Sequence, residues 1–234
     1  MEILFKDILP EDIKDFIEQV AEKTKGYDVY LGGGYLRDIY WNHLNGYRDW
    51  QNYHFGCDNQ PKEPKDIDIF FIPIRDEVKS LPVLPKMYIN YDVPAVDIPN
   101  VRENVAHVRG LFMKDLSTHD IQFIVYDKAM SMKSLAEDMD INLNQVMYCP
   151  RKQTQYMTKD FITSHGNKII KIMHEFELER MFGRIQRMMK KFPDYSVEHN
   201  ISIEDWEYLC YKQEADKKAK KRGNRGGSFI DDGV

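Results

Sequence analysis

The sequence predicts an α+β protein in which strands dominate the first half of the chain and helices the second half. Its 234 residues are 42% hydrophobic and 30% charged, which is typical of an ordinary globular protein. In the first 127 residues, short apolar runs and alternating apolar and polar side chains predict several strands. From about residue 128, apolar residues at helical spacing become more frequent, most clearly at 174–192.

The first half begins with a predicted helix, whose apolar residues recur at helical spacing behind acidic residues in the first turn. The expected order is a helix at 10–26, a strand at 27–31, a glycine turn, a helix at 35–44, and strands at 66–73, 104–113 and 119–127. The last two strands are expected to form an antiparallel hairpin. Residues 45–64 have no periodicity and are predicted to be a loop or insertion, while the proline-rich stretch 79–100 is expected to be irregular.

In the second half, residues 128–148 are interpreted as one or two helices, and "KDFITSHGNKII" at 159–170 is ambiguous. The helix at 174–192 has an apolar face and a basic stripe on another face. The apolar face comprises Leu178, Met181, Phe182, Ile185, Met188, Met189 and Phe192, and the stripe comprises Arg180, Arg184, Arg187 and Lys191. The stripe is either the solvated side of the helix or a ligand-binding surface.

Bulk properties exclude several classes of protein. There is no apolar run of about 18 residues that would span a membrane, and no secretory signal pattern, so a cytoplasmic location is expected. Three distant cysteines do not indicate a disulfide framework. The net charge of −5 does not indicate nucleic-acid binding by the whole chain, but "KKAKKRGNRGG" at 217–227 is strongly basic. This stretch is either a solvated, disordered terminus or an arm that contacts a phosphate backbone.

Paired carboxylates mark the strand at 66–73. Side chains alternate along a strand, so Asp66 and Asp68 share one face while Ile67 points to the other. Two adjacent carboxylates repel each other unless a cation lies between them, and magnesium prefers such oxygen ligands. Asp120 begins another alternating strand and can join them on a neighbouring strand. Asp127 and Asp97 are ranked below Asp120 as a third carboxylate. Without a third carboxylate, Asp66 and Asp68 could simply be solvated aspartates at the end of a strand.

The glycines at 32–34 lie between a predicted strand and a predicted helix. There, free backbone N–H groups and the positive end of the helix can meet a phosphate, and glycine lets the backbone approach it closely. A bare glycine pair more often serves only as a tight turn. The pattern is neither the GxGxxG fingerprint nor a P-loop.

Together, "GGYLRD" at 33–38 and "DIDIFF" at 66–71 resemble the signature of the DNA polymerase β-type nucleotidyltransferase superfamily. The nearest resemblance is to the head domain of tRNA nucleotidyltransferases (CCA-adding enzymes) and bacterial poly(A) polymerases. "EDMDINLN" at 137–144 is similar to that family's ribose-recognition motif, with Asp138 and Asn142 at its Asp and Asn. "GRIQRMMKKF" at 183–192 is similar to its arginine-rich helix, with Arg184 and Arg187 in the arginine places.

The chain also departs from the family pattern. The 32-residue separation of Gly34 and Asp66 is longer than expected, Glu137 stands where the ribose motif has arginine, and Leu143 stands where it has alanine. The base-selecting motif has only "ELER" at 177–180 as a doubtful counterpart. The chain is also too short for the domains that measure a tRNA.

The resemblance implies a nucleotidyltransferase fold: a small mixed sheet with helices on one side, followed by a short helical region. It implies a catalytic head at 1–135 with insertions at about 45–64 and 79–100, a helical region at 136–212, and a basic, disordered tail at 213–234. It further implies two Mg²⁺ ions, with Mn²⁺ as the alternative, held by Asp66, Asp68 and Asp120. Gly33 and Gly34 would cradle the triphosphate, and Arg37 and Asp38 would orient the loop.

Three functional hypotheses follow from the resemblance. The first is transfer of a nucleoside monophosphate from a nucleoside triphosphate, with ATP or CTP expected, to an RNA 3′ end with release of pyrophosphate. The second keeps this chemistry but uses a protein or a small molecule as the acceptor. The third is a non-catalytic nucleotide- or RNA-binding module that reuses the fold.

Overall fold

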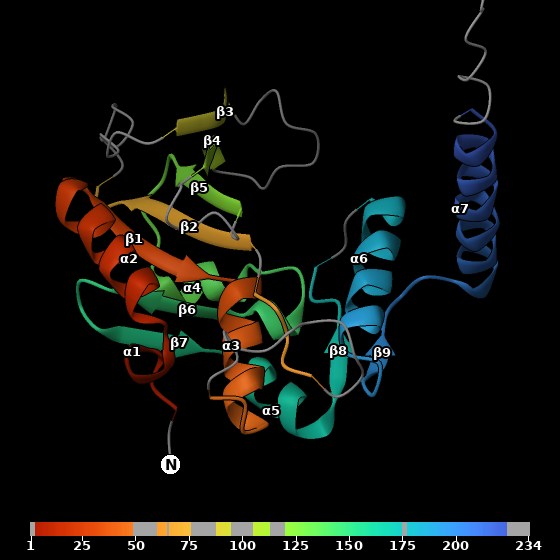
Figure 1. Cartoon of the computed structure of the whole chain (residues 1–234), viewed down its shortest axis with the longest axis horizontal. Coiled ribbons are helices and arrows are strands. Elements are labelled where there is room, and N and C mark those ends of the chain that lie inside the picture. Colours follow the sequence, from red (N-terminus) through yellow and green to blue (C-terminus); the bar gives the residue numbers. More distant parts are fainter. Residues whose placement is uncertain are drawn as a thin grey trace, which may run out of the picture.

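A computed structural model describes residues 3–48, 60–64, 66–75, 88–94, 105–112, 120–174 and 177–223. Its centre is a seven-stranded sheet with the strand order β3-β4-β5-β2-β1-β6-β7 (Figure 1). The strands are β1 (Tyr27–Gly32), β2 (Asp66–Pro73), β3 (Tyr88–Pro94), β4 (Val105–Phe112), β5 (Asp120–Tyr126), β6 (Val146–Cys149) and β7 (Thr154–Met157). Within this sheet β2 and β5 pair in parallel and the other neighbouring strands pair antiparallel, so the sheet is mixed, as predicted.

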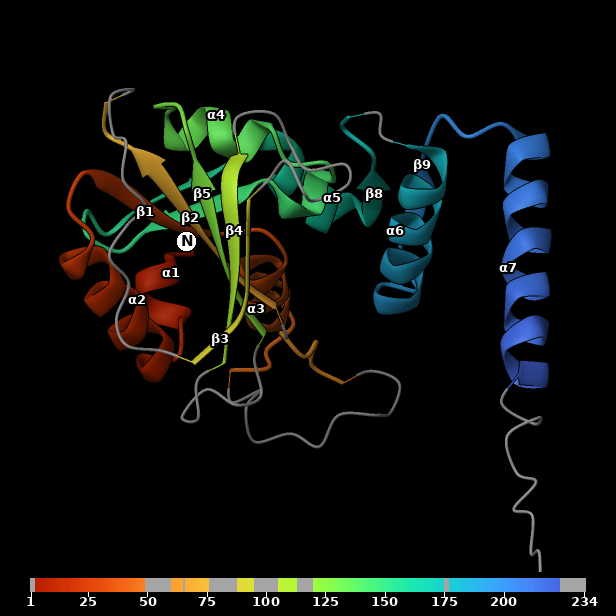
Figure 2. The same ribbon diagram turned by 90° about the horizontal axis from the view of Figure 1, so that it is seen from above.

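Helices cover both faces of the sheet, but unequally. The helices α1 (Phe5–Ile8), α2 (Glu11–Lys23) and α3 (Gly34–Leu44) lie on one side, and the short α4 (Met132–Glu137) lies on the other (Figure 2). Side chains alternate between the two faces of the sheet along β2, so this strand contributes to a hydrophobic core on each face. Ile67, Ile69 and Phe71 pack in the core beneath α1–α3, and Phe70 and Ile72 pack in the core beneath α4. The predicted α+β class, with its main helices on one face, is confirmed.

The sequence signals for α2 and α3 have the expected physical origin. In α2, Ile13, Phe16, Ile17 and Val20 bury one face, and Glu11 and Asp12 in the first turn complement the helix dipole. The helix α3 starts at Gly34, where the glycine turn ends, and most of its side chains are buried. The glycine turn is therefore fixed between a central strand and a core helix.

The rest of the chain packs beside the sheet. It contains the 3₁₀ turn η4 (Asn142–Asn144), α5 (Lys159–Asn167), β8 (Ile169–Lys171), α6 (Leu178–Lys191), β9 (Ser196–Glu198) and α7 (Ile203–Gly223). The strands β8 and β9 form a separate parallel pair. Met181, Phe182, Ile185 and Met188 of α6 are buried as predicted, whereas Met189 is 43% exposed.

Two predicted element types are wrong. The stretch 79–100, expected to be irregular, contains β3, an edge strand that pairs with β4 through a bulge between Ile89 and Tyr91; its Pro94 is tolerated at the strand end. Residues 146–148, expected to be helical, lie in β6 between β1 and β7. A four-residue apolar run does not by itself distinguish a strand from a buried helix.

The predicted domain boundaries at 135 and 212 stay predictions. The strands β6 and β7, within the predicted helical region at 136–212, belong to the main sheet. The helix α7 continues through Gly223, into the stretch predicted to be a disordered tail. The described parts of the predicted insertion, 45–48 and 60–64, contain no helix or strand, while 49–59, Asp97 and the predicted hairpin turn at 114–118 lie outside the described residues.

No helix in the described part of the chain is long and apolar enough to cross a membrane. Cys149 and Cys210 carry free thiols, and Cys57 lies outside the described residues.

Candidate functional site

The three predicted carboxylates meet at one end of the two parallel strands. Asp66 of β2 is in register with Asp120 of β5, and Asp68 is two residues further along β2. Adjacent strands lie about 4.8 Å apart, so Asp66 and Asp120 start the two strands side by side with their side chains on the same face. Asp66 and Asp120 are exposed and Asp68 is half-buried. The structure therefore places the three residues at the same end of two adjacent strands.

The glycine turn lies against these carboxylates. Gly32 pairs with Asp68 across β1 and β2, and a methyl group added at Gly33 would lie 3.5 Å from Oδ2 of Asp68. Gly33 has φ of 69°, a conformation that favours glycine, and it is the N-cap of α3 without any side-chain cap. The first amides of a helix lack intrahelical acceptors. The N-terminus of α3 thus presents positive backbone groups beside Asp68.

The backbone arrangement suits a divalent cation, since three carboxylates on one face are hard oxygen ligands of the kind that magnesium prefers. The side chains themselves do not form a metal site as they stand. Among the described residues, no group of three or more His, Cys, Asp or Glu side chains is close enough to hold a metal ion.

Arg37 and Asp38 are buried behind the glycine turn. The guanidinium of Arg37 donates to both carboxylate oxygens of Asp38, at 2.8 and 3.1 Å, and to Oδ1 of Asn144 at 2.8 Å. Its carbon also lies 5.6 Å from the centre of the Phe192 ring. Arg37 therefore joins α3 to η4 and to the end of α6, a geometry that suits the orienting role expected for the pair.

Two lysines near this site were missed by sequence reasoning. Lys191, at the end of α6, forms an ion pair with Asp38 and donates to the carbonyl oxygen of Glu63 at 3.2 Å. Burial lowers the pKa of Lys191 and Arg37 acts in the same direction, while the negative charges of Asp38 and Asp66 oppose them. Lys191 thus brings a positive charge from α6 to Asp38, behind the glycine turn. The sequence did not predict this role, because it shows Lys191 only as one member of the basic stripe.

The second lysine is Lys62, in the segment that leads into β2. Its ammonium lies 4.5 Å from the centre of the Trp41 ring and 5.4 Å from that of Phe192. Burial is the main cause of its lowered pKa. Asn42 fixes the backbone of Lys62 with two hydrogen bonds, one from Nδ2 to the carbonyl oxygen at 2.8 Å and one from the Lys62 amide to Oδ1 at 2.6 Å. These contacts anchor the chain four residues before Asp66 to α3.

The two residues predicted for ribose recognition occupy different environments. Asp138 is the half-buried C-cap residue of α4. Asn142 is buried, and its amide group is engaged on both sides: Nδ2 donates to Ser164 and to the carbonyl of Ile169, and Oδ1 accepts from the amides of Leu143 and Lys171. A ribose contact by Asn142 would have to replace some of these bonds. Its geometry suits the positioning of η4 against α5 and β8.

The same Asp-x-x-x-Asn spacing recurs two residues later, in Asp140 and Asn144. Asp140 is 1% exposed and forms an ion pair with Arg184 of α6, while Asn144 accepts from Arg37. Asn144 thereby connects directly to the Arg37–Asp38 pair. Repetition of the spacing could have identified these residues, but the sequence gives no basis for choosing between the two registers.

The two predicted nucleotide-binding arginines also differ. Arg184 neutralises the buried Asp140 and is itself only partly exposed, whereas Arg187, one turn further along α6, is exposed. With Lys191 paired to Asp38, two members of the basic stripe hold buried carboxylates. The basic stripe therefore includes residues that form ion pairs with buried carboxylates, and is not only a solvent-exposed face.

Comparison with known proteins identifies solved structures that share this fold. No protein-family model and no curated protein matches the chain. Among solved structures, a CCA-adding enzyme in complex with ATP matches with a TM-score of 0.51 at 16% identity, over 85% of this chain and 43% of that one. The Thermotoga maritima CCA-adding enzyme complexed with tRNA matches with 0.51 at 15%, over 86% of this chain and 44% of that one. A CCA-adding enzyme in complex with CTP matches with 0.50 at 15%, over 93% of this chain and 46% of that one.

These similarities confirm the predicted resemblance at the level of the fold. The chain has the nucleotidyltransferase head-domain fold and spans less than half the length of each of these three enzymes.

Proposed function

We propose that this protein is a metal-dependent nucleotidyltransferase that transfers a nucleoside monophosphate from a nucleoside triphosphate to a hydroxyl group. The observation that carries this proposal is the register of Asp66 with Asp120, with Asp68 on the same face and the Gly33 turn against it. The arrangement combines anionic ligands for a cation with backbone donors for a phosphate. It occurs in a fold shared with enzymes that were solved with ATP and with CTP.

In this proposal, the triphosphate binds with its β- and γ-phosphates at Gly33 and Gly34, at the N-terminus of α3. Asp66, Asp68 and Asp120 would hold magnesium or manganese, which would supply charge neutralisation at the phosphates. Asp120 would also accept the proton of the acceptor hydroxyl. The bond from this oxygen to the α-phosphorus forms as the bond from the α-phosphorus to the pyrophosphate oxygen breaks. Lys191 would add a positive charge at Asp38, behind the phosphate-binding turn.

The acceptor that we propose is the 3′ end of an RNA. One of the solved structures with this fold is a complex with tRNA. The preferred nucleotide is proposed to be ATP or CTP, the ligands of the related complexes. A protein or small-molecule acceptor would use the same site, and the assay below separates these outcomes.

The test is label transfer from each of the four α-labelled nucleoside triphosphates to total RNA and, in parallel, to total protein. We expect RNA labelling that requires Mg²⁺ and falls roughly 10²–10³-fold or more in Asp66→Ala, Asp68→Ala and Asp120→Ala, because charge stabilisation dominates this chemistry. Asp127→Ala is the matched control, since Asp127 is exposed and lies at the opposite end of the same strand from Asp120. This control should retain full activity.

Nucleotide binding gives a second, independent measurement. Titration of ATP and CTP with and without Mg²⁺ should show affinity that depends on the metal and is lost in Asp66→Ala. Metal-independent binding, with equal and negligible labelling by wild type and variant, would contradict the proposal and indicate a binding module. Labelled protein with unlabelled RNA would retain the chemistry but reassign the acceptor.

A further inference from the structure

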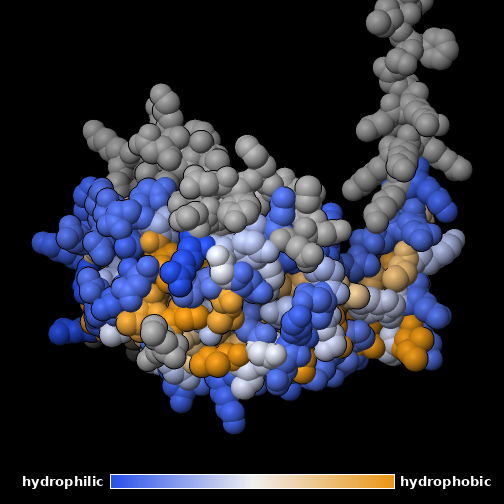
Figure 3. All heavy atoms as spheres, turned by 60° about the horizontal axis from the view of Figure 1, so that its bottom comes forward, coloured by the Kyte–Doolittle hydropathy of each residue, from blue (hydrophilic) through white to orange (hydrophobic). Residues whose placement is uncertain are grey.

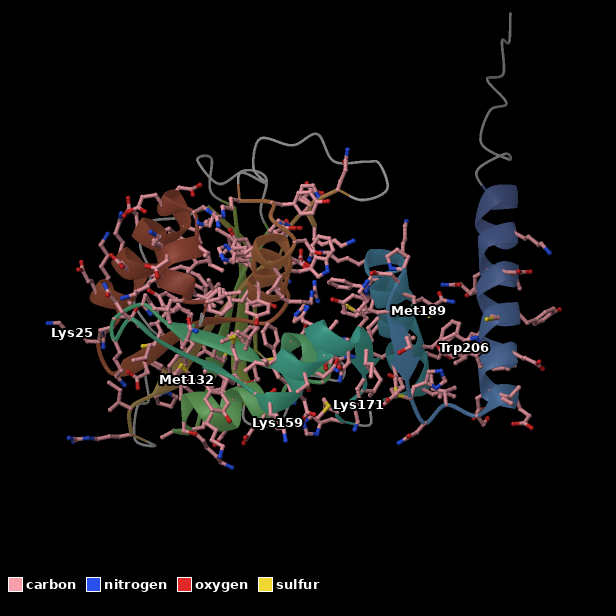
Figure 4. The ribbon with its side chains drawn as sticks, turned by 90° about the horizontal axis from the view of Figure 1, so that it is seen from below. Lys25, Met132, Lys159, Lys171, Met189 and Trp206 are labelled. Carbon is pink, nitrogen blue, oxygen red and sulfur yellow. The ribbon has the colours of Figure 1, made fainter. Side chains whose placement is uncertain are left out.

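The helix α7 is attached to the rest of the protein along only part of its surface. It stands beside α6 and away from the sheet (Figures 1 and 2). Trp206 reaches toward α6, where its ring meets that of Phe182 with centres 4.7 Å apart (Figure 4). Leu209 and Cys210 complete this contact, and Lys212 pairs with Glu179. These residues define the inner face of α7.

The opposite face of α7 carries large exposed side chains. Tyr208 is 59% exposed and Tyr211 is 74% exposed. The spacing of three and four residues continues through Ala215 and Lys218, which are also exposed. We call Tyr208, Tyr211, Ala215 and Lys218 the outer stripe. Figure 3 shows orange, hydrophobic surface on the lower face of the molecule, whereas tyrosine is not an orange residue on this scale. Adjacent exposed aromatic side chains on one helix face are typical of an interaction surface.

Charge is divided sharply along α7. Residues 203–216 contain five acidic residues, Glu204, Asp205, Glu207, Glu214 and Asp216, against one basic residue, Lys212. Residues 217–223, the end of this helix, contain five basic residues and no acidic one. Two such helices in parallel would place like charges together. In an antiparallel pair, the acidic half of each helix would meet the basic half of the other.

We propose that α7 is a self-association surface that pairs antiparallel with α7 of a second copy of this chain. The pair would be centred near Ala215, at the change of charge, where a small side chain allows close approach of two helices. This arrangement is two-fold symmetric, so each contact forms twice. Tyr208 and Tyr211 of each copy would face the basic half of the other, where aromatic rings and cations attract each other.

The position of the tyrosines favours a second copy of the chain over RNA. Both lie in the acidic half of α7, among Glu204, Glu207 and Glu214, whose charges repel a phosphate backbone. A single-stranded RNA that stacked on Tyr208 and Tyr211 would therefore meet negative charge along the same turns. A basic helix end of a second copy meets attraction there instead. The inference does not depend on nucleotidyl transfer.

Sedimentation velocity of the full chain tests this proposal. We expect a concentration-dependent change from monomer to dimer between about 1 and 200 µM, the range of a weak interface. The dimer should weaken from 0.05 to 0.5 M salt, because salt screens exposed charges. Tyr208→Ser/Tyr211→Ser should remain monomeric throughout this range. Ile162→Ser, which removes a comparably exposed apolar side chain from α5, should dimerise like the wild type.

A charge-exchange experiment tests the antiparallel orientation. One variant carries Lys217→Glu, Lys218→Glu, Lys220→Glu and Lys221→Glu, and the other carries Glu204→Lys, Glu207→Lys, Glu214→Lys and Asp216→Lys. Each variant alone should be monomeric because all its helix contacts would be between like charges. Their equimolar mixture should restore dimers, and circular dichroism should show unchanged helix content.

Three results would overturn the proposal. The wild type could remain monomeric at 200 µM, the mixture of exchanged variants could fail to associate, or the Ile162→Ser control could lose the dimer as the tyrosine variant does. If the lysine-to-glutamate variant lost affinity for single-stranded RNA while the wild type showed no self-association, α7 would instead be an RNA-binding arm.

Discussion

Replacement of Arg184 by alanine tests the assignment of this residue to structure rather than to nucleotide contact. Arg184 is the ion-pair partner of Asp140, which is 1% exposed. Loss of the guanidinium would leave a buried carboxylate without its cation. Removal of one partner from a buried pair is strongly destabilising because the remaining charge is left uncompensated. The variant should therefore lose stability whether or not a nucleotide is present.

The magnitude follows from the burial of the two partners. Breaking a fully buried pair costs about 3–5 kcal/mol. The side chain of Arg184 is 28% exposed, so water can approach the vacated position and reduce this cost. We expect a loss of about 2–4 kcal/mol in the free energy of unfolding, which corresponds to a fall in Tm of roughly 4–16 °C for a chain of this size.

Urea unfolding monitored by circular dichroism measures this loss. Arg187→Ala is the matched control, since Arg187 lies on the same helix and is exposed; it should change stability by less than about 0.5 kcal/mol. The double variant Asp140→Leu/Arg184→Met should recover most of the loss, because it removes both charges and retains apolar volume. Equal stability of Arg184→Ala and Arg187→Ala, with nucleotide affinity reduced only in Arg184→Ala, would refute this reasoning.

Three further substitutions test the glycine turn and the buried histidine. Gly32→Ala would bring its Cβ into steric conflict with Sδ of the buried Met147, so we expect a loss of about 1–3 kcal/mol in the free energy of unfolding measured with urea. Gly33→Ala imposes a side chain at φ of 69° and ψ of −139°, a backbone conformation largely restricted to glycine, so it should cost about 1–3 kcal/mol of stability and weaken nucleotide affinity measured by titration. Gly166→Ala, with no neighbour near its added Cβ, should leave affinity unchanged. Burial, reinforced by Arg37, lowers the pKa of His165 to about 3, below its ordinary value of 6.5. The unfolded chain then binds the extra proton, so this contribution to stability is complete above pH 6.5 and falls by about 3 kcal/mol between pH 6.5 and 4. His165→Phe should flatten that part of the pH profile of unfolding, and an unchanged slope would contradict it.

The parts of the site that follow strand alternation were predictable from the sequence. Asp66 and Asp68 could be assigned to one face because the side-chain period of a strand is fixed, and Asp120 could be expected to join them if its strand lay beside theirs, as it does. The glycine turn was likewise predictable, because the glycines lie between a predicted strand and a predicted helix. These signals are local in the sequence, and the structure retains each of them.

The missed residues depend on contacts between distant parts of the chain. Lys191 reaches Asp38 across 153 positions, and Arg37 reaches Asn144 across 107. Neither partner carries a local pattern that distinguishes it from a solvated residue of the same type. The strand β6 was missed for the same reason, because its identity depends on pairing with β1 at the other end of the head. The roles of these residues and the identity of β6 therefore depend on tertiary contacts, which the periodicity of the sequence does not reveal.

These distant contacts predict that the head cannot be separated from α6. Asp38 and Asp140 are each about 1% exposed, and their cations Lys191 and Arg184 both come from α6. A chain that ends at residue 173 would leave Asp140 without its cation and Asp38 with Arg37 alone, and would uncover the apolar surface against which Met188 and Phe192 pack. We expect this truncation to lose cooperative urea unfolding, while a chain that ends at residue 201 retains it. A cooperative transition for the shorter chain, with the stability of the full chain, would show that the two ion pairs are dispensable for the head.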